Sequence, residues 1–254
     1  MKSVYFIALN TLKETIRNKV LYNILFIAIL AIYLSISFGE WSVFARTKVI
    51  QDFGLATMSL SGLLLAIFIG VGMLGKELES KTVYQLASKP VRRSSIILGK
   101  FAGLCITLLL NFLLLTLFFL GVLLAIGGSV EPDLLTGILL SGCELAVIIS
   151  IAVFFSTVTN STVSAFLTLA VYIAGHFNDL MEISMIAQKN VFHAFILKII
   201  YYIIPNLEHF NIRSNVVYNI PLPSSYIPFA LLYAFLFTAL FLTLACAVFS
   251  RKDL

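Results

Sequence analysis

Two overlapping motifs near residue 70 have the glycine spacing of nucleotide-binding loops. Gly70, Gly72 and Gly75 fit the pattern GxGxxG, and residues 70–76 fit most of a Walker A motif. Both motifs require a strand before the glycines and a helix after them, whereas here a long apolar stretch comes first. Walker A also requires Ser or Thr after its lysine, and this chain has Glu77. We interpret these glycines as small residues that let helices pack closely, and we predict that the chain itself binds no cofactor.

Side chains that could ligate a metal or act as nucleophiles do not form a recognisable motif. No HExxH motif and no CxxC pair occurs, and Glu208-His209 has no third ligand at a suitable spacing. The cysteines and histidines stand far apart in the sequence: Cys105, Cys143, Cys246, His176, His193 and His209. The sequence therefore predicts no metal site, no catalytic residue and no enzymatic activity of the chain by itself.

Two polar side chains stand inside apolar stretches, where hydrocarbon would surround them. Glu144 is in the middle of one stretch and Asn111 is in another. An ionised carboxylate in hydrocarbon is costly, so Glu144 must face protein, water or a partner, or stay protonated. Asn111 raises the same question more weakly, because an amide costs less to bury. Both are candidates for a polar spot on a transport path or, for Glu144, a proton-sensitive group; a hydrogen bond between helices is the alternative.

The composition indicates that lipid surrounds most of the chain. Of its 254 residues, 60% are hydrophobic and 11% are charged, against roughly 25% charged residues in soluble domains. So few charges cannot cover this much apolar surface in water. The net charge of +5 is therefore interpreted through membrane orientation, and we expect the lipid bilayer, not nucleic acid, as a partner.

Stretches free of charge predict the membrane spans, because a helix needs about 20 apolar residues to cross the bilayer. They are residues 20–39, 53–75, 101–130, 134–178 with Glu144 inside, and 214–250. A polar cluster at residues 156–162 divides the fourth stretch into spans near 134–156 and 162–181. Because prolines near residues 221–228 disfavour a helix there, we expect the last span to run from about Ser225 to Phe249. We therefore predict an all-α polytopic membrane protein, a single domain over residues 1–254 with six transmembrane helices.

The lysines and arginines predict the orientation of these spans. With six spans, both termini lie on one side, together with the connection between spans two and three. All but five of the 17 basic residues fall on that side; the exceptions are Arg46, Lys48, Lys189, Lys198 and Arg213. Because basic residues concentrate on the cytoplasmic side, we expect a multi-pass protein of the cytoplasmic (inner) membrane with both termini in the cytoplasm.

Two segments outside the spans are expected to lie at the membrane surface. Residues 1–19 form an amphipathic pattern, with apolar residues at helical spacing from Tyr5 to Val20, and predict an interfacial helix. A simple extension of span one is the alternative. Residues 183–224, between spans five and six, predict an extracytoplasmic segment. Within it, residues 190–204 predict an outer interfacial helix that does not cross the membrane, because charges interrupt its apolar face.

The segment at residues 76–95, between spans two and three, carries a dense set of charges. It can form a short helix, which Pro90 would stop. Arg92 and Arg93 would then lie at the headgroup boundary. A compact polar segment held between two spans can transmit a force from a soluble partner to both of them. We therefore predict that this cytoplasmic segment couples the spans to such a partner.

This segment resembles the signature of the ABC type-2 permeases. The matching residues are Glu77-x-Glu79, Lys81-Thr82-Val83-Tyr84, Ser88-Lys89-Pro90-Val91-x-Arg93 and Leu98-Gly99-Lys100. The six-span plan, the basic N-terminal helix and the basic tail are similar as well, so the resemblance covers essentially the whole chain. One departure is Lys81, where many members have Gly. In the family this stretch docks onto the ATPase subunit, which implies an ATPase-coupling role for Glu77, Glu79, Lys81, Thr82, Pro90, Arg92 and Arg93.

The resemblance implies the transmembrane subunit of an ATP-driven ABC transporter, an exporter whose ATPase is a separate chain. Two ATPase copies would bind the ATP and Mg, and a second permease copy would complete a homodimer, with a heterodimer as the alternative. A secondary carrier and a non-transporting membrane anchor are the alternative functions. Carriers often show internal repeats and helices broken at midspan, and no convincing repeat occurs in this sequence. The substrate does not follow from the sequence.

Overall fold

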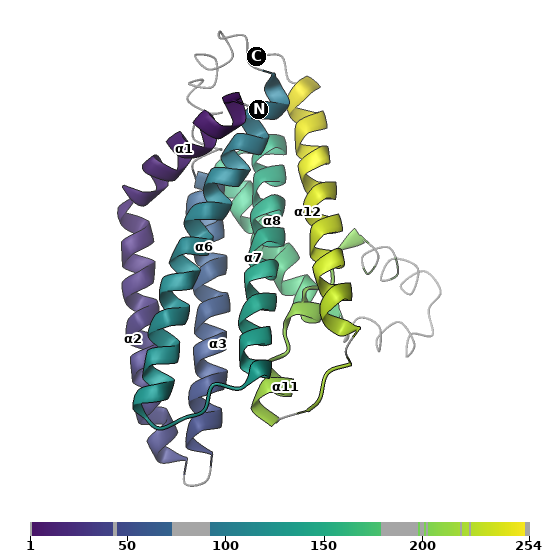
Figure 1. Ribbon diagram of the computed structural model, residues 1–254. Coiled ribbons are helices and arrows are strands. Elements are labelled where there is room, and N and C mark those ends of the chain that lie inside the picture. Colours follow the sequence, from purple (N-terminus) through teal and green to yellow (C-terminus); the bar gives the residue numbers. More distant parts are fainter. Residues whose placement is uncertain are drawn as a thin grey trace.

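The protein is a bundle of long helices that run along one another (Figure 1). The computed structural model describes residues 2–42, 45–72, 92–178, 203–218, 220–223 and 225–251, with residues 198 and 201 singly. The longer helices are α1 (Lys2–Ile16), α2 (Lys19–Trp41), α3 (Arg46–Leu65), α6 (Arg93–Ala125), α7 (Pro132–Val158), α8 (Ser161–His176) and α12 (Tyr226–Arg251). Three short elements are the π-helix η1 (Ala66–Val71), the 3-10 helix η2 (Leu207–Phe210) and α11 (Arg213–Tyr218). These ranges contain no strand, which agrees with the predicted all-helical class.

Five helices are long and apolar enough to cross a membrane: α2, α3 continued by η1, α6, α7 and α12. They correspond to five of the six predicted spans. The predicted fifth span is α8, which has 16 residues and is therefore about 24 Å long, shorter than the roughly 30 Å of the bilayer core. It ends at His176, before the expected residue 181. The count of six spans stays a prediction.

The helices extend beyond the charge-free stretches that predicted them. α3 begins at Arg46, although the sequence predicted a start near residue 53, and α6 begins at Arg93, although the prediction was residue 101. Arg46 and Lys48 are exposed, so the first turns of α3 can carry charge outside the hydrocarbon. Charge therefore marks the limit of the apolar core, not the end of the helix.

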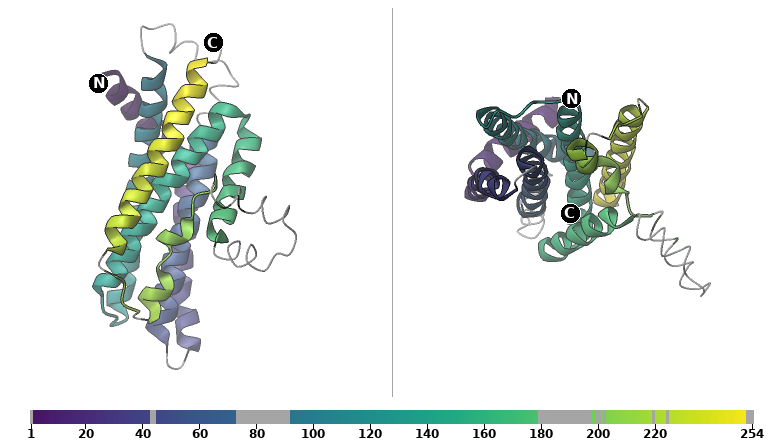
Figure 2. Two further views of the ribbon diagram at one scale, coloured as in Figure 1. Left: turned by 90° about the vertical axis from the view of Figure 1, so that its right-hand side faces the viewer. Right: turned by 90° about the horizontal axis from the view of Figure 1, so that it is seen from below.

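Helix α7 is the centre of the bundle. In the most apolar part of α7, 67% of the residues are buried inside the protein. The corresponding share is 11% in α12 and 22% in α2. Helix α12 packs along α7, α2 along α3, and α1 along the beginning of α6 (Figure 2). Glycines of α3 also allow it to approach α6 and α7 closely: Gly54 faces the ring of Phe119, and Gly62 faces the side chain of Leu145.

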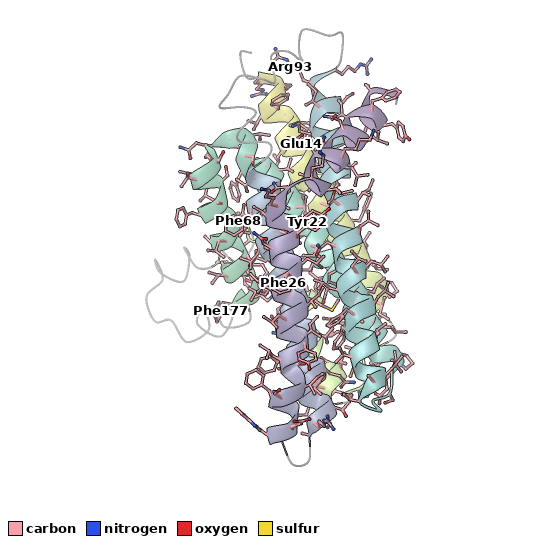
Figure 3. All side chains as sticks on the ribbon, turned by 90° about the vertical axis from the view of Figure 1, so that its left-hand side faces the viewer. Glu14, Tyr22, Phe26, Phe68, Arg93 and Phe177 are labelled. Atoms are coloured by element: carbon pink, nitrogen blue, oxygen red, sulfur yellow. The ribbon has the colours of Figure 1, made fainter. Side chains whose placement is uncertain are left out.

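The outward faces of the bundle are apolar. Tyr22 and Phe26 project from α2, Phe68 from η1 and Phe177 from the end of α8 (Figure 3). Each of these four side chains is at least half exposed. Large apolar side chains spread over a surface in this way are expected where lipid, not water, is the solvent.

Helix α1 is a separate element that meets α2 at an angle (Figure 1). The break falls at Asn18, whose side-chain oxygen accepts a hydrogen bond from the Val20 backbone N–H and so caps α2. Tyr5, on the predicted apolar stripe, is exposed, whereas Ala8 and Thr11 are buried against α6. The helix is therefore not a simple extension of α2. Its place in the membrane interface stays a prediction.

A turn lies at each end of α7, and the polar cluster at residues 156–162 predicted the second of them. Before α7, Gly127 has a φ of 76°, in the left-handed region that glycine adopts without strain, and it ends α6. After α7, only Thr159 and Asn160 separate it from α8, and the Asn160 side chain caps α8 by accepting from the Val163 N–H.

Candidate functional site

A segment at residues 205–218 packs into the end of the bundle remote from the termini (Figure 1). The sequence predicted only an extracytoplasmic connection there. Its apolar side chains are buried, at 0–3% exposure: Leu207, Phe210, Ile212 and Val216. Gly175, near the end of α8, makes room for it, because a Cβ at that position would lie 2.8 Å from Leu207 Cγ and from the Pro205 carbonyl oxygen. We call residues 205–218 the docked segment.

Two tyrosines of α12 hold the docked segment by hydrogen bonds. The Asn206 backbone N–H donates to the Tyr233 hydroxyl oxygen at 2.7 Å. The Tyr226 hydroxyl donates to the His209 carbonyl oxygen at 2.9 Å. Backbone groups that lack helix partners are thus satisfied inside an apolar bundle, which is the condition for irregular chain at this depth.

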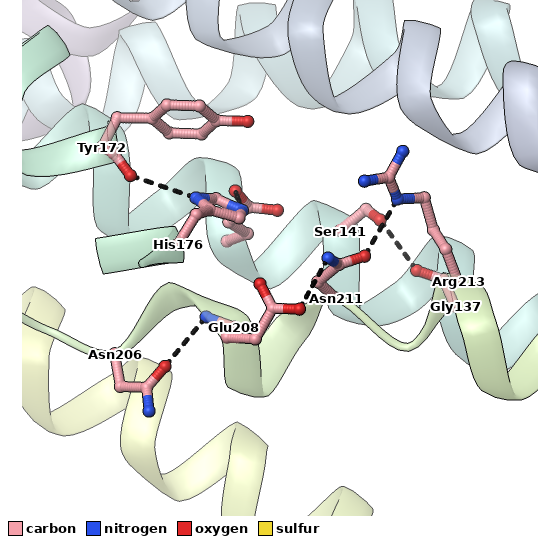
Figure 4. A network of polar contacts seen from close by, with 9 residues as sticks. Gly137, Ser141, Tyr172, His176, Asn206, Glu208, Asn211 and Arg213 are labelled. Carbon is pink, nitrogen blue, oxygen red and sulfur yellow. Dashed lines mark hydrogen bonds and ion pairs between the residues drawn. The ribbon is translucent and has the colours of Figure 1, made fainter. Parts of the chain in front are cut away.

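A chain of polar contacts crosses the docked segment (Figure 4). The Asn211 amide donates to Glu208 Oε1 at 2.9 Å, and its oxygen accepts from Arg213 Nε at 2.9 Å. Arg213 Nη1 lies 4.0 Å from Asp52 Oδ1 on α3. The amide of Asn211 therefore links the carboxylate of Glu208 to the guanidinium of Arg213. The guanidinium extends this series of polar contacts to α3.

Glu144 of α7 is 2% exposed and faces protein, which is one of the alternatives that the sequence left open. Its Oε1 atom lies 3.4 Å from Nε2 of His176, the last residue of α8. The geometry is that of an ion pair and not of a hydrogen bond, so Glu144 Oε1 has no hydrogen-bond partner among the described residues. The structure thus brings together two residues that are far apart in the sequence.

Two protonation arrangements would leave the pair of Glu144 and His176 neutral overall. His176 Nδ1 lies 3.1 Å from the Tyr172 carbonyl oxygen (Figure 4), which can only accept, so Nδ1 carries a hydrogen. Either Nε2 is protonated as well and faces a carboxylate, or Nε2 is bare and Glu144 carries the proton. Both arrangements are neutral overall, which lowers the cost of burying the two groups in hydrocarbon.

Asn111, the second predicted intramembrane polar residue, lies on α6 and is 3% exposed. Neither its amide nitrogen nor its oxygen has a hydrogen-bond partner in the described part of the chain. A buried amide in that state costs about 1–3 kcal/mol. The alternative of a hydrogen bond between helices is therefore not seen for Asn111 within the described ranges.

Most of the predicted ATPase-coupling residues lie outside the described residues: Glu77, Glu79, Lys81, Thr82 and Pro90. Arg92 and Arg93 are described, at the start of α6. Arg92 is exposed, and Arg93 Nη1 donates to the Ser250 carbonyl oxygen at 3.2 Å, in the last turn of α12. A cation at the carbonyl end of a helix is favourable, so Arg93 ties the start of α6 to the end of α12.

The glycines near residue 70 do not pack as closely as the sequence suggested. Gly70 lies in η1, where an added Cβ would make an ordinary contact of 3.7 Å with the Ala152 Cβ, and a Cβ at Gly72 would meet nothing within 4 Å. Among the described residues, close packing is therefore not seen at Gly70 or Gly72, and Gly75 lies outside them. Close packing is seen instead at Gly99 and Gly103 on α6, which face α1 one helical turn apart.

Three features were not predicted from the sequence: the contact of His176 with Glu144, the series of polar contacts through Asn211, and the docked segment. Glu208, Asn211 and Arg213 alternate with the buried Leu207, Phe210 and Ile212. Such interleaving of charged and apolar residues just after a proline was a usable signal for a segment that is neither a loop nor a span.

Comparison with known proteins gives one family. The family model described as ABC-2 family transporter protein matches residues 5–254. No curated protein matches the chain significantly. The matched residues include the helices at the end of the bundle where both termini lie, the docked segment and the predicted coupling residues.

Proposed function

The chain belongs to the ABC-2 family of transporter proteins, and from this premise we propose that it is the permease subunit of an ATP-driven exporter whose ATPase is a separate chain. The observation that carries the proposal is the match of nearly the whole chain, residues 5–254, to one transporter family. A multi-pass bundle of apolar helices supports the same function.

The packing of helices at the end of the bundle where both termini lie (Figure 1) supports a coupling role for residues 76–95. The helices on either side of this segment are both fixed in the bundle: η1 packs against α7 and α8, and the start of α6 packs against α1. Arg93 adds a hydrogen bond to the last turn of α12. A force applied to the segment would therefore reach α3, α6 and α12 together. In this proposal the cytoplasm holds this end, both termini and the ATPase.

The proposed assembly contains two permease copies and two ATPase copies. A homodimer of this chain is the simplest form, and a heterodimer with a related permease is the alternative. ATP and Mg would bind only to the ATPase subunits. Binding of ATP would bring those subunits together and tilt the spans through residues 76–95.

Glu144 and Asn111 are the proposed polar positions on the transport path. Asn111 has unused hydrogen-bonding atoms within the described residues, and there Glu144 Oε1 lies 3.4 Å from His176 Nε2 without a hydrogen bond. Groups of this kind can bind a polar part of a substrate when the bundle opens. Hydrogen bonds gained at that moment would offset part of the cost of opening.

The experiment that tests the coupling role is co-purification of the ATPase with the permease, together with the ATPase rate. Glu79→Lys should reduce both at equal membrane levels of the permease, because a lost charge-assisted contact costs on the order of 2 kcal/mol. The matched control is Glu40→Lys. Glu40 is an exposed glutamate at the opposite end of the bundle, and its reversal should change neither quantity.

A contrary result is equally specific. If Glu79→Lys and a Gly-Ser replacement of residues 79–88 both leave co-purification and the ATPase rate unchanged, this segment does not couple the subunits. The permease function would then need another contact surface for the ATPase.

A further inference from the structure

An open pocket lies between the first turns of α3 and the docked segment. Its volume is about 380 Å³. Two basic side chains, one acidic side chain, one amide and two aromatic rings line it: Lys48, Arg213, Asp52, Asn211, Phe53 and Tyr218. The proposed transport path does not use this pocket.

The charges in the pocket are held in place before any ligand arrives. Arg213 Nε donates to the Asn211 side-chain oxygen at 2.9 Å, which fixes the guanidinium plane. Lys48 Nζ lies 5.5 Å from the centre of the Tyr218 ring, within the range of a cation–π contact. Asp52 lies 4.0 Å from Arg213 Nη1 and is about half exposed, so its carboxylate remains accessible. Two cations against one anion leave an excess of one positive charge.

Aromatic residues place the pocket at the level of lipid headgroups. Phe38 stacks on Phe53, a pocket residue, with 5.2 Å between ring centres. Trp41 meets Phe38 edge-on at 5.7 Å and is 79% exposed. Exposed Trp and Tyr side chains near the end of a span are typical of the boundary between hydrocarbon and water. A ligand in the pocket can therefore keep its apolar part in the bilayer.

We propose that this pocket binds the headgroup of an aminophospholipid. Its phosphodiester contacts Lys48 and Arg213, because the phosphate oxygens can accept charge-assisted hydrogen bonds from both cations. Its ammonium group donates hydrogen bonds to Asp52. The three charged side chains thus match the two charges of a phosphoethanolamine headgroup, with the cations and the anion on the correct partners.

The same chemistry distinguishes this ligand from similar ones. A choline headgroup has the same phosphodiester, but its methylated nitrogen has no hydrogen to donate to Asp52. Inorganic phosphate has the anionic group but no acyl chains to lie beside Phe53 and Trp41. The pocket should therefore prefer phosphatidylethanolamine to phosphatidylcholine, and it should not bind free phosphate comparably.

The single tryptophan of the chain gives a direct test. The full-length protein is reconstituted into phosphatidylcholine vesicles that contain brominated phosphatidylethanolamine or, in a parallel series, brominated phosphatidylcholine. Bromine quenches the fluorescence of Trp41 when the lipid is adjacent. We expect stronger quenching by the ethanolamine lipid at equal mole fraction. Lys48→Gln should lower its relative binding constant about five-fold, because the phosphodiester loses one of its two cationic contacts.

Two further variants and one competitor complete the test. Arg46→Gln is the matched control, because Arg46 is a neighbouring exposed cation that pairs with Glu40 and does not line the pocket; its binding should be unchanged. Asp52→Ala, which removes the acceptor for the ammonium hydrogens, should abolish the preference for ethanolamine over choline. Equal quenching of the wild type by both lipids, or the same loss for Arg46→Gln as for Lys48→Gln, would overturn the proposal. Displacement of the lipid by millimolar inorganic phosphate would show a soluble phosphate site instead.

Discussion

Replacing Gly103 by alanine should separate α1 from α6. A Cβ at this position would lie 2.6 Å from the Ala8 carbonyl oxygen and 2.7 Å from Thr11 Cβ. Neither atom belongs to the flexible end of a side chain, so no rotamer change can relieve the clash. The whole of α1 must shift instead. Overpacking of this kind costs about 1–3 kcal/mol.

The same substitution also has a favourable effect that must be subtracted. Alanine stabilises a helix interior by about 1 kcal/mol relative to glycine. Gly121 on the same helix provides the control, because a Cβ there would meet nothing within 4 Å. Gly121→Ala gains the helix propensity without the clash. The free energy of unfolding should therefore differ between the two variants by the overpacking term alone, roughly 1–3 kcal/mol.

Thermal unfolding of the purified protein in one detergent measures this difference. For a chain of this size, 1 kcal/mol shifts the unfolding temperature by about 2–4 °C. Gly103→Ala should therefore unfold roughly 2–12 °C below Gly121→Ala. Equal unfolding temperatures for the two variants would refute the close approach of α1 to α6.

Three further predictions concern the topology, the buried pair and the docked segment. Reporter fusions after Leu254 and within residues 206–220 should report opposite sides of the membrane; one side for both would exclude six spans. A double-mutant cycle of Glu144→Ala and His176→Ala, measured by unfolding, should give a coupling of about 0.6–1.7 kcal/mol, and additive effects would mean that the two do not interact. Gly175→Ala, whose Cβ would lie 2.8 Å from a backbone carbonyl of the docked segment, should lower the unfolding temperature; an unchanged value would contradict that contact.

The long helices could be predicted from the sequence because their signal is local. An apolar stretch such as residues 101–130 needs no partner to indicate a span, and its helix α6 ends at Ala125, five residues before the end of that stretch. Helix ends were less predictable, because the first turns of α3 carry exposed charges that the chain tolerates outside the hydrocarbon.

The site was predictable only in part. A carboxyl group at Glu144 had to face something other than lipid, and the sequence alone indicates this. Its partner His176 was not predictable, because the contact depends on where α8 ends. The glycines at 70 and 72 show the opposite error: their spacing resembles a packing motif, but nothing in the sequence shows what faces them.

The π-helical turn η1 gives α3 a way to rotate. A π turn holds one residue more than an α-helical turn, because its hydrogen bonds span five residues instead of four. When such a turn migrates by one position, the residue that it passes turns about the helix axis by roughly 100° while the flanking turns keep their hydrogen bonds. η1 packs against α7 and α8, and the proposed coupling segment at residues 76–95 follows it closely in the chain. In the proposed function, a force applied to residues 76–95 can then turn the residues of α3 that the π turn passes, so that they present other side chains to the core.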